Sequence, residues 1–107
     1  MNALDKYKKG IRSLKGADFA GADLSYKSLS GKDVNLTSST FTFADCTGTS
    51  FAGANLSLTN FAGAHLEGTS FAFCNLSGAN FEGATLVNCN FHNATNIPNN
   101  LNTSQND

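Results

Sequence analysis

The sequence predicts an all-β solenoid, and two observations carry this prediction. A large apolar residue stands at every fifth position from residue 14 to residue 91, with a single slip of two residues. This period matches neither the helical turn nor the two-residue alternation of a strand, so it indicates an internal repeat. Charged residues make up only 14% of the chain, yet the apolar series supplies the buried area that stacked repeats need. We call these residues centres: Leu14, Phe19, Leu24, Leu29, Leu36, Phe41, Cys46, Phe51, Leu56, Phe61, Leu66, Phe71, Leu76, Phe81, Leu86 and Phe91.

A second series, of small residues, lies two positions before the centres. In an extended segment, residues two apart face the same side, so both series are expected to point inward. The outward positions carry mainly Asp, Asn, Ser, Thr and Gly, and Gly often stands two residues after a centre, where a tight turn gains from its freedom. The small inward series is Ala17, Ala22, Ala44, Thr49, Ala54, Thr59, Ala64, Thr69, Cys74, Ala79, Ala84 and Cys89.

Several pentads follow the pattern Ala-(Asp/Asn)-Leu-X-X, for example residues 17–21, 54–58 and 79–83. They resemble the pentapeptide-repeat family from residue 12 to about residue 95, and the opening segment is similar to that of short bacterial, cyanobacterial-like members. The resemblance implies a right-handed quadrilateral parallel β-helix with four pentads per coil and about four coils. In such a coil the Phe centres at 41, 61 and 81 would stack opposite those at 51, 71 and 91.

The chain divides into three expected parts. Residues 1–13 form an N-terminal helical cap, in which Asn2 caps the helix, Leu4 and Tyr7 share one face, and Gly10 ends it. Residues 14–95 form the β-helix, and residues 96–107 form a largely disordered C-terminal tail. The register slips at residues 30–33, and this segment should bulge from one corner, as either a tolerated insertion or a contact. Val34 then takes the inward position two residues before Leu36.

Charge is distributed unevenly along the chain. All seven Lys and Arg fall in the first 32 residues, so residues 1–33 carry +3 and residues 34–107 carry −4. In a solenoid this makes a weak axial dipole, and the bases are too few on any one face to favour nucleic-acid binding. No segment is long and apolar enough for a membrane span, and three cysteines that cannot all pair favour a reduced, cytoplasmic setting.

We expect neither catalysis nor a cofactor nor a metal site, because the repeat packs its interior solid. The spacing of Cys89 and His92 is that of a metal pair, but the first would point inward and the second outward. All three cysteines occupy inward positions, as small apolar fillers. His65 should stack next to Asp45 and form a weak ion pair, and outward Asn residues should form amide ladders between coils.

Four outward apolar residues are the candidate interaction surface, and Leu58 and Phe73 flank one face. We expect a non-enzymatic interaction or scaffold module with an unknown protein partner. The alternative is a DNA-mimicking inhibitor of an enzyme such as gyrase, as the resemblance implies for the quinolone-resistance members. An end-to-end homodimer through the C-terminal coil, around Leu86 and Phe91, is a further expectation. The candidate residues are Tyr26, Phe43, Leu58 and Phe73.

Overall fold

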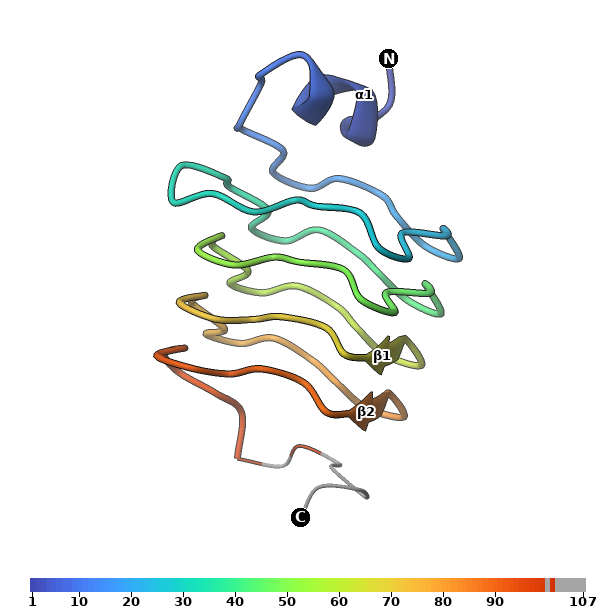
Figure 1. The fold of residues 1–107 in the computed structure, drawn as a ribbon, viewed down its shortest axis with the longest axis vertical. Coiled ribbons are helices and arrows are strands. Elements are labelled where there is room, and N and C mark those ends of the chain that lie inside the picture. The colour runs from blue at the N-terminus through green and yellow to red at the C-terminus, as the bar shows by residue number, and fades with distance from the viewer. Residues whose placement is uncertain (100, 102–107) are drawn as a thin grey trace.

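The fold is a stack of coils with one short helix over its N-terminal end (Figure 1), in a computed structural model that describes residues 1–99 and 101. Helix α1 runs from Ala3 to Lys8, and the side chain of Asn2 accepts a hydrogen bond from the Asp5 N–H at 2.8 Å. Gly10 follows the helix at a φ of +92°. The structure thus places Asn2 and Gly10 at the two ends of α1, and within the tail expected to be largely disordered, residues 96–107, residues 100 and 102–107 lie outside the described residues.

Parallel bridges join each coil to the next. The first coil is bridged to the second by residues 22 apart, as in Ser13 with Asn35, and later coils by residues 20 apart, as in Asn35 with Asn55. Each circuit contributes a bridge at every fifth residue, which gives the coil four sides. The two extra residues of the first circuit are the predicted slip, and Val34 fills the inward slot with only 1% of its surface exposed.

Every backbone N–H of a middle pentad has its own acceptor, as the pentad around Leu56 illustrates. The N–H groups of the centre and of the residue two later, Leu58, donate to the following coil. The N–H of Asn55 donates back to Val34 of the preceding coil, and that of Ala54 closes a turn onto the Phe51 carbonyl. The remaining N–H, of Ser57, donates to Oδ1 of Asn55 at 3.0 Å. The residue before the centre is therefore polar because its side chain accepts from the N–H two residues later, which has no carbonyl acceptor in a neighbouring coil.

This local bond corrects the predicted Asn ladders. Asn35, Asn55 and Asn75 stack in register, but each side-chain oxygen accepts from the N–H two residues further on. Asn60 and Asn80 do the same. Among the described side chains, Asn96 to Asn75, at 3.1 Å, is the one amide bond between coils. The Asn residues thus stabilise turns within a coil.

Two short strands form where that local bond is lacking. Strand β1 runs from His65 to Glu67 and strand β2 from Thr85 to Val87, and they pair in parallel with Leu66 opposite Leu86. Within the described part of the chain, His65 and Thr85 accept no bond from the N–H two residues later. The backbone there stays extended over three residues because no side chain draws it into a turn.

The core consists of stacked centres, as predicted. Rings at 19, 41, 61 and 81 stack with centroids 4.7–5.1 Å apart, and the opposite stack at 51, 71 and 91 has spacings of 5.3–5.6 Å. The two stacks meet edge to face, with Phe61 and Phe71 at 5.5 Å and 89°. The edge-to-face contact is favourable for aromatic quadrupoles, so both stacks hold the interior closed.

Buried hydroxyls and thiols in the small inward series are bonded to carbonyls. The Thr69 hydroxyl donates to the carbonyl of Cys46 at 2.7 Å, and the Cys74 thiol donates to that of Phe51 at 3.0 Å. No buried side-chain nitrogen or oxygen in the described residues lacks a partner. The interior is therefore a satisfied packing core.

Candidate interaction surface

The four predicted surface residues share one backbone position. Each lies two residues after a centre and adopts a left-handed φ between 57° and 61°. Non-glycine residues rarely adopt this conformation, so the repeat geometry imposes it. The side chains leave the corners of the coil and are largely exposed: Tyr26 by 79%, Phe43 by 75%, Leu58 by 62% and Phe73 by 59%.

Three of these side chains lie against a glycine of the following coil. A Cβ atom added to Gly48 would come within 2.5 Å of the Tyr26 ring, and one at Gly63 within 2.5 Å of the Phe43 ring. Leu58 covers Gly78 in the same way, at 2.6 Å. These glycines are needed for the close approach as well as for their positive φ. The exposed apolar residues are thus held in place by the coil that follows them.

The fourth residue, Phe73, lies edge-on to the ring of His92, with centroids 5.6 Å apart. His92 therefore points outward, while the Cys89 thiol donates inward to the Leu66 carbonyl at 3.0 Å. The two side chains face opposite sides of the backbone, in agreement with the sequence prediction.

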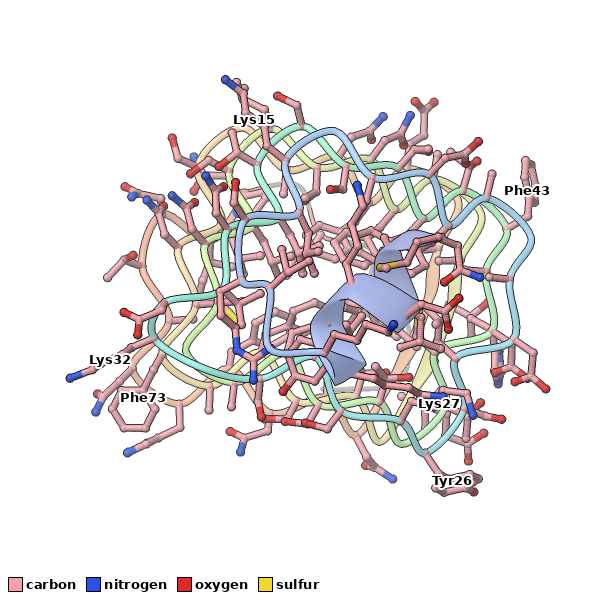
Figure 2. The ribbon with its side chains drawn as sticks, turned by 90° about the horizontal axis from the view of Figure 1, so that it is seen from above. Lys15, Tyr26, Lys27, Lys32, Phe43 and Phe73 are labelled. Atoms are coloured by element: carbon pink, nitrogen blue, oxygen red, sulfur yellow. The ribbon has the colours of Figure 1, made fainter. Side chains whose placement is uncertain are left out.

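The corners carrying these residues do not converge on one stripe. Viewed along the stack, Tyr26, Phe43 and Phe73 project at three separate places on the outline (Figure 2). The Tyr26 and Phe43 corners are the two ends of the face that contains β1 and β2. The sequence instead predicts Leu58 and Phe73 as the pair that flanks one face. The 22-residue first circuit would have placed Tyr26 over Gly48 and so revealed the other pair.

The face between Tyr26 and Phe43 carries an acidic column. Asp23 bridges to Asp45 and Asp45 to His65, so the three stack in register. Hydrogen bonds from Ser25 and Thr47, respectively, lower the pKa of Asp23 and Asp45 below the usual 3.8, so both are ionised at neutral pH. His65 Nε2 lies 3.5 Å from Oε1 of Glu67, so its ion contact is with Glu67 rather than with Asp45 as expected. Residues two apart on β1 share the outward side, which brings that pair together.

A shallow groove of about 380 Å³ runs along the Tyr26 corner. The corner column reads Tyr26, Gly48, Gly68 and Asn88 from one coil to the next, and Thr47 and Glu67 line the groove beside it. Tyr26 covers Gly48, but a Cβ at Gly68 would meet nothing within 4 Å. The missing side chain at Gly68 therefore leaves a notch between the tyrosine and Asn88. We call this feature the corner notch.

The cysteines are poor nucleophiles in the folded chain. Burial raises the pKa of Cys46 to about 12 and that of Cys74 to about 11, and it also raises the pKa of Cys89. A thiol with such a pKa is protonated at neutral pH and does not react as a thiolate. The described residues hold no group of three His, Cys, Asp or Glu placed to bind a metal.

Two further hollows lie between α1 and the first coil, with volumes of about 350 and 180 Å³. Asn2 and Ala3 line both, and Lys6 and Lys15 line the larger. They are gaps under a short helix rather than a convergent set of polar groups. No helix in residues 1–99 and 101 combines the length and apolar character needed to span a bilayer.

The repeat matches a family of known proteins and is similar to several solved structures. The sequence profile of pentapeptide repeats matches residues 32–68 and 64–95, with eight copies. No curated protein matches the chain. Similar solved structures include a pentapeptide repeat protein from Nostoc PCC 7120, at 27% identity and a TM-score of 0.47, over 90% of this chain and 85% of that one.

Two further solved structures are similar over part of their length. A protein of the Arabidopsis thaliana thylakoid lumen shares 27% identity at a TM-score of 0.45, over 79% of this chain and 61% of that chain. The fluoroquinolone resistance protein QnrB1 shares 26% identity at a TM-score of 0.40, over 75% of this chain and 41% of its own. The chain thus spans less than two thirds of the length of both.

Proposed function

Because the chain belongs to the pentapeptide-repeat family, we propose that it is a non-enzymatic protein-interaction module that binds its partner through the outer surface of the β-helix. The observation that carries the proposal is the division between inside and outside. Inward positions are filled by apolar residues and satisfied hydroxyls, so chemical variety is confined to the faces and corners. A surface of this kind recognises partners by shape and charge and needs no catalytic group.

Site-specific crosslinking tests this proposal. A photoreactive phenylalanine analogue replaces Tyr26, Phe43, Leu58 or Phe73 in four separate variants, all at exposed positions that tolerate a large ring. After irradiation in a native lysate, a reproducible adduct from one corner and not from the others is expected, with the adduct mapped by mass spectrometry. Equal, non-selective adducts from all four corners, or none at all, would refute a specific interaction surface.

The alternative function is inhibition of a DNA-binding enzyme such as gyrase by mimicry of DNA. The stacked carboxylates of Asp23 and Asp45, with Glu67 two residues beyond His65 on the same face, favour it. The charge count opposes it: four coils at ~4.8 Å match duplex DNA with about 12 phosphates, against eight acids and seven bases in the chain. A supercoiling assay with excess protein tests the alternative, which unchanged gyrase activity would eliminate.

The three free thiols support a reducing compartment such as the cytoplasm as the place where the module acts. Fractionation of cells expressing the tagged chain tests this assignment. Recovery of the chain from an oxidising compartment would overturn it.

A further inference from the structure

The corner notch combines three features that together suit one kind of ligand. Tyr26 offers an exposed aromatic ring at one end, and Asn88 offers an amide at the other. Glu67 lines the groove between them with about half of its side chain exposed. Because the Tyr26 ring covers Gly48, the open level is that of Gly68, and the Gly48 and Asn88 levels on either side of it are two coil spacings apart, roughly 10 Å.

The charge around the notch is negative. Asp23 and Asp45 are held ionised by their hydroxyl partners on the adjoining face, and Glu67 stands at the notch itself. Lys27, next to Tyr26 in sequence, adds one positive charge in this region, which the carboxylates of Asp23, Asp45 and Glu67 outnumber. His65 contacts Glu67 at 3.5 Å and is a charged partner only when protonated. A cation is therefore the complementary ligand.

We propose that the corner notch binds an arginine side chain of a partner protein, with the guanidinium stacked on Tyr26 and paired with Glu67. A guanidinium is planar, stacks on aromatic faces and matches a carboxylate in two-point geometry, whereas an ammonium offers only a point charge. The bare backbone at Gly68 gives the arginine stem room to reach Glu67. This inference rests on the proposed interaction function and names the site and the chemistry of its partner.

The direct test is an NMR titration of the ¹⁵N-labelled full chain with acetyl-Gly-Arg-Gly-amide. Matched probes carry lysine, or citrulline, which has the shape of arginine without its charge. The arginine probe should shift the amides of Gly48, Gly68 and Asn88 more than those of Gly63 and Gly83 on the Phe43 corner. The citrulline probe should leave all of them unchanged. Equal affinity for the lysine and arginine probes would overturn the assignment to arginine.

Two glycine variants make the test specific. Gly68→Asn fills the notch, and it preserves the backbone because Asn88 and Asn93 already adopt the same left-handed φ. Gly21→Asn is the control, since Gly21 has the same φ of 68° and equally open space on a different corner. Binding should be lost in the first and kept in the second, with similar thermal midpoints for both. Unchanged binding by Gly68→Asn would refute the notch.

Two side-chain variants separate the contributions of charge and ring. Glu67→Gln and Tyr26→Ala should each weaken the arginine probe about two- to fivefold, the range expected for an exposed ion pair and an exposed cation–π contact. Shifts that instead track every carboxylate on the surface would contradict a defined site. The failure of this test is distinguishable from that of the proposed function. If crosslinking yields an adduct at another corner, the interaction module stands and the notch does not.

Discussion

The two ends of the solenoid are closed differently. At the N-terminal end, α1 lies over the first coil, Leu4 and Tyr7 pack against the core, and the Tyr7 hydroxyl donates to the Ser30 carbonyl at 2.8 Å. At the other end, Phe91 and Cys89 remain partly exposed, although Leu101 packs against the core. Residues of the same repeat position are fully buried in the middle. The difference shows that a pentad reaches its full burial only when a neighbour covers it on both sides.

The largest expected effect distinguishes the middle of the stack from its C-terminal end. Phe61→Ala removes a fully buried ring that stacks on Phe41 and Phe81, and it should lower the free energy of unfolding by about 3–5 kcal/mol. Phe91→Ala should cost clearly less because its ring is partly exposed and stacks on one side only. Urea denaturation of both variants measures the difference. Equal losses would mean that the C-terminal end is as well covered as the middle.

Alkaline destabilisation should follow the same gradient of burial. Burial raises the folded-state pKa values of Cys46 and Cys74. The contribution of these protonated thiols to the free energy of unfolding is therefore fully present below the unfolded thiol pKa of about 8.5. It falls as the pH rises from there towards the folded-state values. Each such thiol should cost roughly 1.4 kcal/mol per pH unit in that window. The free energy of unfolding, measured from about pH 8 to about pH 10, gives the slope of stability against pH above the unfolded thiol pKa.

Cys74→Ala is the control for this slope. Alanine already occupies the equivalent inward position at Ala54 and is buried there, so the variant should fold and lose one thiol's share of the slope. A slope unchanged in Cys74→Ala would show that other groups, not the buried thiols, cause the alkaline loss.

A smaller effect tests the attachment of α1 to the first coil. Tyr7→Phe removes the hydrogen bond to Ser30 and keeps the ring, so it should cost about 0.5–1.5 kcal/mol. Amide hydrogen exchange should quicken in the first coil and stay unchanged around Leu66. If protection falls throughout the stack, α1 stabilises the whole solenoid rather than its end.

The smallest expected energy concerns association. We propose that the less covered C-terminal end pairs two copies weakly, through the exposed part of Phe91. Light scattering over a concentration series should show a mass rising towards that of a dimer. The variant Phe91→Ser should suppress that rise. A monomer at every concentration would refute the pairing.

The sequence was sufficient to predict the fold wherever position alone decides it. The five-residue period placed the centres, the inward thiols and Val34 correctly because burial depends only on register. The strand bounds at His65–Glu67 and Thr85–Val87 were not predictable in this way. They depend on whether the residue before the centre captures a nearby N–H, which is a matter of side-chain geometry.

The candidate surface was predicted only in part. Exposure of Tyr26 and Phe43 followed from their register, but their contact with glycines of the following coil did not. That contact depends on the direction of a left-handed corner and on the 22-residue first circuit. The predicted ion pair of His65 with Asp45 rests on stacking between coils, whereas Glu67 lies on the same strand as His65.

The hydrogen-bond pattern of the pentad gives the stack a direction. Each middle pentad sends two N–H groups to the following coil and one to the preceding coil. The first coil therefore presents surplus carbonyls outward, and the lysines of the first 32 residues lie at that electronegative end. The last coil presents surplus N–H groups: those of Phe91 and Asn93 find no backbone acceptor among the described residues. Two C-terminal ends facing each other would set donors against donors, so such a pair must be held by side chains and cannot continue the ladder.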